Sequence, residues 1–444
     1  MPNVSEMPQK TFAITTLGCR LNQFDSDAIE RMAKERGWTI AKPEEAAVHI
    51  VNGCTITHDA DADSRQAVRR AHKRAPDARI VVTGCYANSA APEAAQLAGV
   101  SAVIGNGEKH ELFELFEGGD AGAPLIAVDD LRQKARNAAL TPALAPRRAR
   151  TYLKVQDGCD YKCSFCIVPR VRGKSVSIAV AALVEQLKAI VATGTPEIVL
   201  TGVHLGTYGR DLNPRVSLTE LIAAFVPHLN TCRLRLGSLD PHEVTDDLVA
   251  LMLEYPDKIC RHLHLPVQSL DSDTLRAMRR AHSAEDFQSA VDKLRVLPDL
   301  CLGTDVITGF PAEDDAAFNR TLATLKAAPL AYMHVFSYSP RRQTEAENLG
   351  DPVSKAEKQR RTGALRELSQ EKHRAFVASQ QGAVRDAVVL RARDRQSGKL
   401  VALTDNYIRA LCDGPNSLLG KGVRARVLGV NEYDAPFGEL AGKN

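Results

Sequence analysis

The sequence lacks the features that mark several large classes of protein. No apolar run approaches the roughly 18–20 residues that a transmembrane helix needs, which excludes an integral membrane protein. The opening residues, MPNVSEMPQK, include an acid and no sustained apolar stretch, so we expect no secretory signal and a cytoplasmic protein. With 25% charged and 44% hydrophobic residues, the composition also excludes disorder, collagen and coiled coil. The length of 444 residues predicts about three domains.

The net charge is small, and its distribution is more informative than its total of +3. Residues 340–444 contain 19 Lys/Arg and 13 Asp/Glu, so the basic surplus lies in the C-terminal region. A basic region on a near-neutral body can accommodate a polyanionic partner. On charge alone, a solvated helical face is the simpler interpretation.

The ten cysteines favour metal or redox chemistry over disulfides in a cytosolic chain of this size. In residues 1–130, the apolar runs TFAITTL, AAVHIVN and ARIVVTG are followed by Cys19, Cys54 and Cys85, and helical stretches separate them. Strands that alternate with helices predict a parallel sheet covered by helices. Because the carboxyl ends of parallel strands share one edge, where ligands bind, we expect the three thiols to converge.

Residues 151–340 repeat the strand-then-helix pattern more often. The candidate strands are at 151–156, 197–202, 232–238, 262–267, 300–307 and 332–339. Six strands, where a closed TIM barrel has eight, predict a partial barrel with an open side that admits a large substrate. The chemistry of such folds lies just past the strand ends.

Two further segments complete the predicted organisation. Residues 131–150 contain six basic residues, no acid and two prolines, a composition typical of an exposed linker. A basic helix at 353–379 ends the central domain, which we place at 151–378. In residues 379–444, apolar and polar residues alternate with period two in segments that Gly and Asn turns separate. This pattern predicts a small antiparallel barrel. Such barrels often bind RNA or DNA, and a capping domain without a ligand is the alternative.

The most specific pattern is GCDYKCSFC at residues 158–166, directly after the first barrel strand. It spaces Cys159, Cys163 and Cys166 as C-x3-C-x2-C. A structural zinc site needs four ligands, usually in C-x2–4-C pairs, and no fourth cysteine is close in the sequence. Three thiolates on a four-iron cluster leave one iron open to a small molecule. The spacing is therefore compatible with an iron–sulfur cluster, and zinc or unrelated packing are the alternatives.

This loop resembles the cluster motif of the radical S-adenosylmethionine (SAM) superfamily. Residues 151–176, together with EIVLTGVHLGTYG, HLHLPVQS and TDVITGFPAE, resemble the radical SAM methylthiotransferases, as do TLGCRLNQ, VNGCTIT and VTGCYA. The resemblance spans nearly the whole chain with the motifs in order. It implies two [4Fe-4S] clusters, bound by Cys159, Cys163 and Cys166 and by Cys19, Cys54 and Cys85. It also implies that the first cluster cleaves SAM to a 5′-deoxyadenosyl radical, that the second delivers sulfur, and that residues 379–444 form a TRAM-like RNA-binding barrel.

SAM is expected to lie across the strand ends of the barrel. The candidate contacts are Gly202, Ser238, Gln268, Asp305 and the backbone of Phe165, and we assign no catalytic residue beyond the cluster and SAM ligands. A polar residue at a strand end can equally be a capping residue. Three histidines could be interpreted as metal ligands, namely His204, His262 and His264. We expect them instead to pack in the core or to form hydrogen bonds.

The opening motif TLGCRLNQ, followed by DADSRQ at 61–66, is most similar to one branch of the family. This branch adds a methylthio group to C2 of N6-threonylcarbamoyladenosine next to the tRNA anticodon. The alternatives are isopentenyladenosine in tRNA and an aspartate of a ribosomal protein. The resemblance implies an anticodon stem-loop as partner, whose phosphates residues 131–150 and 353–379 could bind, together with a flavodoxin-like or similar electron donor and a sulfur source. No membrane is involved.

The sequence departs from the usual family pattern at a few loop positions. These are Gly53, Leu270, Ala312, Asp314, Arg342 and Gln343. None of them is an expected cluster ligand, so the departures concern loop shape.

Overall fold

The computed structural model describes residues 10–117, 123–131, 148–431 and 434–441. It divides into two compact units. The first unit is drawn from residues 1–143, 156–161 and 166–176, and the second from 144–155, 162–165 and 177–444. Most of the expected basic linker, residues 132–147, lies outside the described residues.

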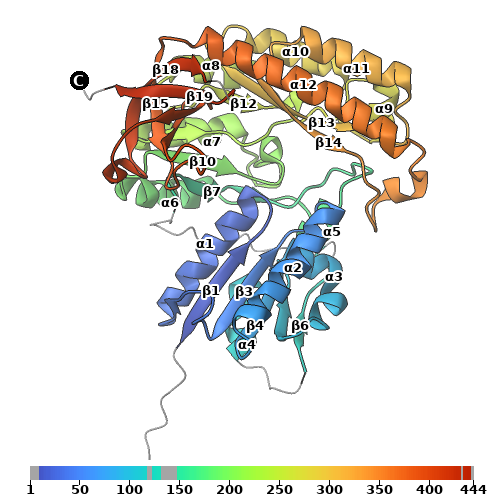
Figure 1. The fold of residues 1–444 in the computed structure, drawn as a ribbon, viewed down its shortest axis with the longest axis vertical. Coiled ribbons are helices and arrows are strands. Elements are labelled where there is room, and N and C mark those ends of the chain that lie inside the picture. The colour runs from blue at the N-terminus through green and yellow to red at the C-terminus, as the bar shows by residue number, and fades with distance from the viewer. Residues whose placement is uncertain (1–9, 118–122, 132–147, 432–433, 442–444) are drawn as a thin grey trace, which may run out of the picture. The chain divides into compact units, whose positions relative to one another are not determined.

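The first unit is a parallel sheet with helices packed on its faces, as predicted (Figure 1). In spatial order its strands are β2 (Thr39–Ile40), β1 (Thr11–Thr16), β3 (Val48–Gly53), β4 (Arg79–Gly84), β5 (Val100–Ile104) and β6 (Leu125–Ala127). The helices are α1 (Arg20–Glu35), α2 (His58–Arg74), α3 (Cys85–Ala95), α4 (Leu112–Glu117) and α5 (Val168–Arg172). Two short strands, β8 (Gln156–Asp157) and β9 (Val176–Ser177), bracket the C-x3-C-x2-C segment in the sequence.

Helix α2 shows why the local sequence adopts this structure. The Thr57 side chain caps its first turn by accepting a hydrogen bond from the Ala60 amide (3.1 Å). Acidic side chains lie in the first turn and basic ones in the last, which is the charge order that the helix dipole favours. Ala67 and Ala71 pack against the sheet together with Val51 and Val82.

The second unit contains the predicted six parallel strands. They are β7 (Thr151–Lys154), β10 (Glu197–Thr201), β11 (Arg233–Arg235), β12 (His262–His264), β13 (Cys301–Thr308) and β14 (Tyr332–Ser337). They form two three-stranded sheets, β11-β10-β7 and β12-β13-β14, which single bridges at Leu234–Ile259 and Ser238–His264 connect. The principal helices of this unit are α6 (Val180–Ala192), α7 (Leu218–Phe225), α8 (Asp246–Glu254), α9 (Ser272–Ala277), α10 (Ala284–Leu294), α11 (Asp315–Ala327) and α12 (Lys355–Ser379).

The two faces of this strand arc differ in chemistry because side chains alternate along a strand. Apolar residues such as Leu234, Leu263 and Val306 belong to one core cluster with the surrounding helices. The intervening residues form the opposite, inner wall of the partial barrel, and on β12 they are His262 and His264. The inner wall is therefore polar, and the core lies between the strands and their helices.

A closed five-stranded barrel follows α12, as the period-two pattern predicts (Figure 1). Its strands are β15 (Val384–Val389), β16 (Leu400–Thr404), β17 (Arg409–Cys412), β18 (Gly422–Val430) and β19 (Pro436–Ala441). All pairs are antiparallel except β17 with β19. Among the described residues, every helix is too short or too polar to cross a membrane.

Candidate active site

In the first unit, three cysteines lie at the carboxyl ends of the neighbouring strands β1, β3 and β4. Cys19 is the N-cap residue of α1, Cys54 follows β3, and Cys85 is the first residue of α3. A Cβ atom added to Gly18 would lie 2.6 Å from the Cys54 sulfur, so these two loops touch. Burial, together with the nearby Cys85 and Cys19, raises the pKa of the Cys54 thiol to about 11. The structure thus brings the three thiols together.

The guanidinium of Arg172 lies against this thiol group. Its Nε donates to the Cys85 sulfur (3.3 Å), and one Nη donates to the Asn22 side-chain oxygen (2.6 Å). Arg172 also forms ion pairs with Asp157 (3.0 Å) and Asp25 (3.0 Å). Its side chain is only 2% exposed. A full positive charge is therefore buried beside a thiol that is an expected cluster ligand.

Asn22 connects the loops that carry the cysteines. Its amide donates to the carbonyl oxygens of Leu17 (2.9 Å) and Gly53 (3.0 Å), directly before Gly18 and Cys54. Lys109 also donates to Asp25 (2.7 Å). The buried network therefore contains two cations, Arg172 and Lys109, and two carboxylates, Asp25 and Asp157. The sequence does not predict this network. Its only local signal is the polar residues within the motifs TLGCRLNQ and VRG.

This donor set fits a four-iron cluster. Three thiolates would leave one iron without a protein ligand, as the resemblance to the radical SAM methylthiotransferases implies. A cluster bound by thiolates carries negative charge. The buried Arg172 offsets negative charge at that position and can donate to a ligand sulfur.

The first unit also contains part of the C-x3-C-x2-C segment. Gly158 has a φ of +74°, and a Cβ there would lie 1.9 Å from the Lys174 carbonyl oxygen, so only glycine fits. The Cys159 amide donates to the Gly173 carbonyl oxygen (3.0 Å). Asp157, two residues before Cys159, is the Arg172 partner described above. Arg172 therefore links Cys85 to the beginning of the other cysteine loop.

Cys163 belongs to the second unit, where Arg280 donates to its sulfur (3.6 Å). Arg280 also donates to the Pro266 carbonyl oxygen (3.0 Å) and pairs with Asp240. Pro266 follows β12 by two residues, so Cys163 lies at the carboxyl end of that strand. Next to it, the Ser164 amide donates to the Met278 carbonyl oxygen (2.9 Å).

Three of the proposed SAM contacts lie near the carboxyl ends of strands, whereas Asp305 lies inside β13, at the fifth of its eight residues. Gly202 directly follows β10, and Ser238 bridges to His264 beyond β11. The backbone N–H of Gln268, a residue with a φ of +64°, donates a hydrogen bond to the Asp305 carbonyl oxygen (2.8 Å). Phe165 packs among Met278, Phe310, Tyr338 and Ala346.

Asp305 lies on the inner wall between two histidines. Its carboxylate contacts His264 Nε2 (3.0 Å) and His334 Nδ1 (3.1 Å). Burial alone would raise the pKa of Asp305, but the bonds from both rings hold it well below its ordinary value. The donor atoms of this His-Asp-His triad lie within 4.8 Å of one another, which is compatible with one metal ion. The sequence motifs predict Asp305 as a site residue but not His334, although the alternation in YMHVFS places His334 on the inner wall as well.

The triad continues into a stack of rings at the amino ends of the strands. The Tyr332 hydroxyl is hydrogen-bonded to His264 (3.1 Å) and His262 (2.8 Å), so both histidines form hydrogen bonds as expected. Tyr407, from the β16–β17 loop of the small barrel, stacks on His262 at 4.1 Å. A loop of the C-terminal barrel therefore packs against the inner wall. His204 is also hydrogen-bonded, to Glu243.

The basic helix expected at 353–379 is α12, and most of its charge is already paired. Four of its seven Lys/Arg side chains form ion pairs: Lys358 with Asp351, Arg360 with Glu357, Arg361 with Glu313, and Arg374 with Asp434. Much of its basic character therefore binds the protein to itself.

Comparison with known proteins gives the same assignment as the motifs. Residues 11–105 match the family described as Uncharacterized protein family UPF0004, and residues 153–325 match the Radical SAM superfamily. The threonylcarbamoyladenosine tRNA methylthiotransferase MtaB of Bacillus subtilis (strain 168) is 32% identical over 94% of both chains. The protein of that name from Aquifex aeolicus (strain VF5) is 35% identical over 94% of this chain and 99% of its own.

A second group of relatives carries another name. The tRNA-2-methylthio-N(6)-dimethylallyladenosine synthase of Aquifex aeolicus (strain VF5) is 30% identical over 97% of this chain and 98% of its own. Among solved structures, the radical S-adenosylmethionine methyltransferase TsrM from Kitasatospora setae matches with a TM-score of 0.56, 13% identity and 77% coverage of each chain. That likeness shows a shared fold. With relatives above 30% identity along nearly its whole length, this chain is an enzyme of the radical SAM methylthiotransferase family.

Proposed function

We propose that this enzyme adds a methylthio group to C2 of N6-threonylcarbamoyladenosine next to the anticodon of tRNA. The observation that carries the proposal is the set of relatives named for this reaction. Four of them, including the two described above, are 32–36% identical over 78–94% of this chain. The dimethylallyladenosine relatives are less similar, at 30%.

The inner wall of the second unit favours the same substrate over the isopentenyl alternative. A threonylcarbamoyl group carries a carboxylate and a hydroxyl, whereas an isopentenyl group is apolar. The wall offers His264, Asp305 and Tyr332, and beyond them the half-exposed His334. An apolar group placed there would desolvate these groups without new hydrogen bonds, which is unfavourable. Phe336, two residues further toward the end of β14, is 48% exposed and can stack on a base.

The chemistry explains why such an enzyme needs a radical. The C2–H bond of adenine is strong and unacidic, so acid–base catalysis alone is a poor route. When bound, two [4Fe-4S] clusters supply one-electron cleavage of SAM and the sulfur, and a second SAM supplies the methyl group. The residues of this chain have positioning tasks. Arg172 orients Cys85 and offsets its charge, and Arg280 does the same for Cys163.

The remaining assignments follow from the same proposal. We assign Cys159, Cys163 and Cys166 to the radical cluster and Cys19, Cys54 and Cys85 to the sulfur-delivering cluster. SAM contacts Gly202, Ser238, Gln268, Asp305 and the Phe165 backbone. The domains are 1–130, a linker at 131–150, 151–378, and a TRAM-like RNA-binding barrel at 379–444. The enzyme acts in the cytoplasm with an external electron donor and a sulfur source.

Nucleoside mass spectrometry of tRNA from cells lacking this protein tests the substrate. We expect loss of the 2-methylthio form of threonylcarbamoyladenosine, with its unmodified precursor accumulating. The matched control is the same strain that expresses the protein with Cys163→Ala, which should also lack the modification. If that nucleoside persists and its isopentenyl analogue disappears, the proposed substrate is wrong.

A further inference from the structure

Helix α2 ends in a cluster of cations that have no acidic partners within the described residues. Arg69, Arg70, Lys73 and Arg74 all lie exposed in its last six residues, and we call them the α2 cationic face. Over the described part of the chain, none of the four forms an ion pair. At 100° per residue they span less than half of the helix circumference. Their fields therefore add on one side.

Elsewhere the exposed cations of the protein are commonly neutralised by neighbours. On α1, Arg31 pairs with Glu35 (2.9 Å) and Lys34 with Glu30 (3.0 Å). On α12, most cations are paired in the same way, as described above. The four cations of the α2 cationic face have no such neighbours among the described residues, and a concentration of unpaired positive charge attracts polyanions.

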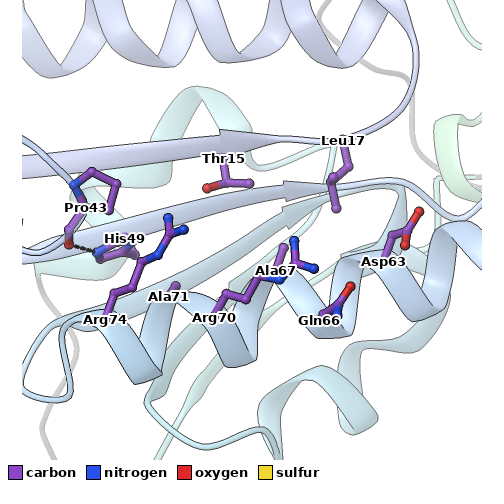
Figure 2. Close-up of a pocket in the computed structure, with 10 residues that line it drawn as sticks. All are labelled: Thr15, Leu17, Pro43, His49, Asp63, Gln66, Ala67, Arg70, Ala71 and Arg74. Atoms are coloured by element: carbon purple, nitrogen blue, oxygen red, sulfur yellow. Dashed lines mark hydrogen bonds between the residues drawn. The ribbon is translucent and has the colours of Figure 1, made fainter.

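A groove beside the α2 cationic face gives it the shape of a binding site. Figure 2 shows this groove, about 390 Å³ in volume, between α2 and the strands β1 and β3. Arg70 and Arg74 line it together with Thr15, Gln66 and His49. Asp63, the only acid in this lining, is eleven residues from Arg74, or about 16 Å along the helix axis.

The lining groups are those that bind phosphodiesters. Guanidinium groups bind phosphate oxygens through two parallel hydrogen bonds, and hydroxyl and amide side chains add further contacts to phosphate and sugar. Thr15 of β1 is exposed, so this part of the strand beside the groove is not covered by a helix. A ligand can therefore reach both the arginines and the sheet.

The position of α2 relates this groove to the cysteine loops. Ser64, on the same helix, accepts a hydrogen bond from the Cys54 amide (3.0 Å) and donates to the Cys54 carbonyl oxygen (2.8 Å). Arg70 and Arg74 follow Ser64 by six and ten residues, so they lie about 9 and 15 Å along the helix from it. An RNA phosphate bound here would therefore lie on the same helix that contacts the Cys54 loop, about 9–15 Å along its axis.

We propose that the α2 cationic face and its groove bind the phosphate backbone of the substrate RNA. This inference rests on the proposed function, since it identifies a surface that such an enzyme uses for its tRNA. It places an RNA contact on the N-terminal domain, in addition to the linker, the basic helix at 353–379 and the C-terminal barrel expected from the sequence.

The test compares two double variants of the full-length enzyme. Arg70→Gln with Arg74→Gln removes two unpaired cations, and Arg31→Gln with Lys34→Gln removes two paired cations from α1 of the same unit. Binding of a fluorescent anticodon stem-loop RNA is measured between 50 and 200 mM salt. If each arginine contacts one phosphate, the α2 variant should bind about 15- to 30-fold more weakly at 0.15 M salt, and its log–log salt slope should be smaller by about 1.4–1.8. The α1 variant should bind like the unchanged enzyme.

The outcomes separate this inference from the proposed function. Equal binding by the α2 variant, or an equal loss in both variants, overturns the inference while the tRNA substrate stands. If the unchanged enzyme does not bind the stem-loop, the proposed function itself fails. A titration with inorganic phosphate at constant ionic strength tests whether the groove binds free phosphate instead of RNA phosphates. If it abolishes the difference between the variants at millimolar concentration, the groove is a small-anion site and the RNA assignment is wrong.

Discussion

Replacing Arg172 tests the buried charge network of the first unit most directly. Arg172→Gln removes a guanidinium that is paired with Asp157 and Asp25 and donates to Cys85. Lys109 still pairs with Asp25, so the main loss is the pair with Asp157. Breaking one buried ion pair by removing a single partner destabilises a protein by about 3–5 kcal/mol. That is a large part of the roughly 5–15 kcal/mol by which a typical protein is stable.

The chain contains a suitable reporter for this measurement. Its single tryptophan, Trp38, is buried in the first unit, where it contacts Phe113 and Phe116. Urea unfolding followed by Trp38 fluorescence therefore reports on that unit. With an m-value of about 2 kcal/mol/M, we expect the unfolding midpoint to fall by about 1.5–2.5 M urea.

A charge-balanced variant provides the control. Arg172→Met combined with Asp157→Leu removes both charges of the pair, and replacing a buried ion pair by apolar residues of similar volume is often neutral or stabilising. We expect it to recover most of the lost stability, while the contact to Cys85 stays absent. An unchanged midpoint for Arg172→Gln, or equal instability of the double variant, would refute the electrostatic reasoning.

Three further predictions address the metal sites, the specificity and the pH dependence. Cys85→Ala should reduce the iron content of anaerobically reconstituted protein from about eight to about four atoms per chain, with SAM cleavage retained; equal iron contents would exclude the second cluster. His334→Phe should lower kcat/KM for threonylcarbamoyl RNA relative to isopentenyl RNA by about 10- to 150-fold, the effect of one hydrogen bond to a charged group. A constant ratio would remove His334 from specificity. Burial would raise the pKa of Glu197, but Arg235 holds it at about 2. The resulting stability is present above the ordinary pKa of about 4.5 and is lost as the pH falls from there toward 2, by roughly 3 kcal/mol in total. Circular dichroism of Glu197→Gln should show a flatter acid dependence in that window, and an unchanged profile would contradict the assignment.

Much of the architecture could be predicted because its signals are local. The six strands of the partial barrel are apolar runs at regular spacing, and all six are present in the structure. The convergence of Cys19, Cys54 and Cys85 follows from one rule of parallel sheets, since each cysteine comes directly after a strand. The family assignment rested on ordered motifs, and the comparisons confirm it.

The side-chain networks could not be predicted in the same way. Arg172 and Asp25 are 147 residues apart, and His334 and Asp305 are 29 apart on neighbouring strands. Whether a charged residue is buried depends on which distant groups the fold places beside it. No local pattern contains that information.

The two basic helices show the division most clearly. The sequence alone determined that residues 353–379 form a helix rich in Lys and Arg and that a helical stretch separates the second and third cysteine motifs, because periodicity and composition are properties of a single segment. Only the tertiary structure decided that the α12 cations are largely paired with acids from other segments, whereas the α2 cations remain available. A charge becomes a binding group or an internal contact according to its neighbours in space, and those neighbours come from distant parts of the chain.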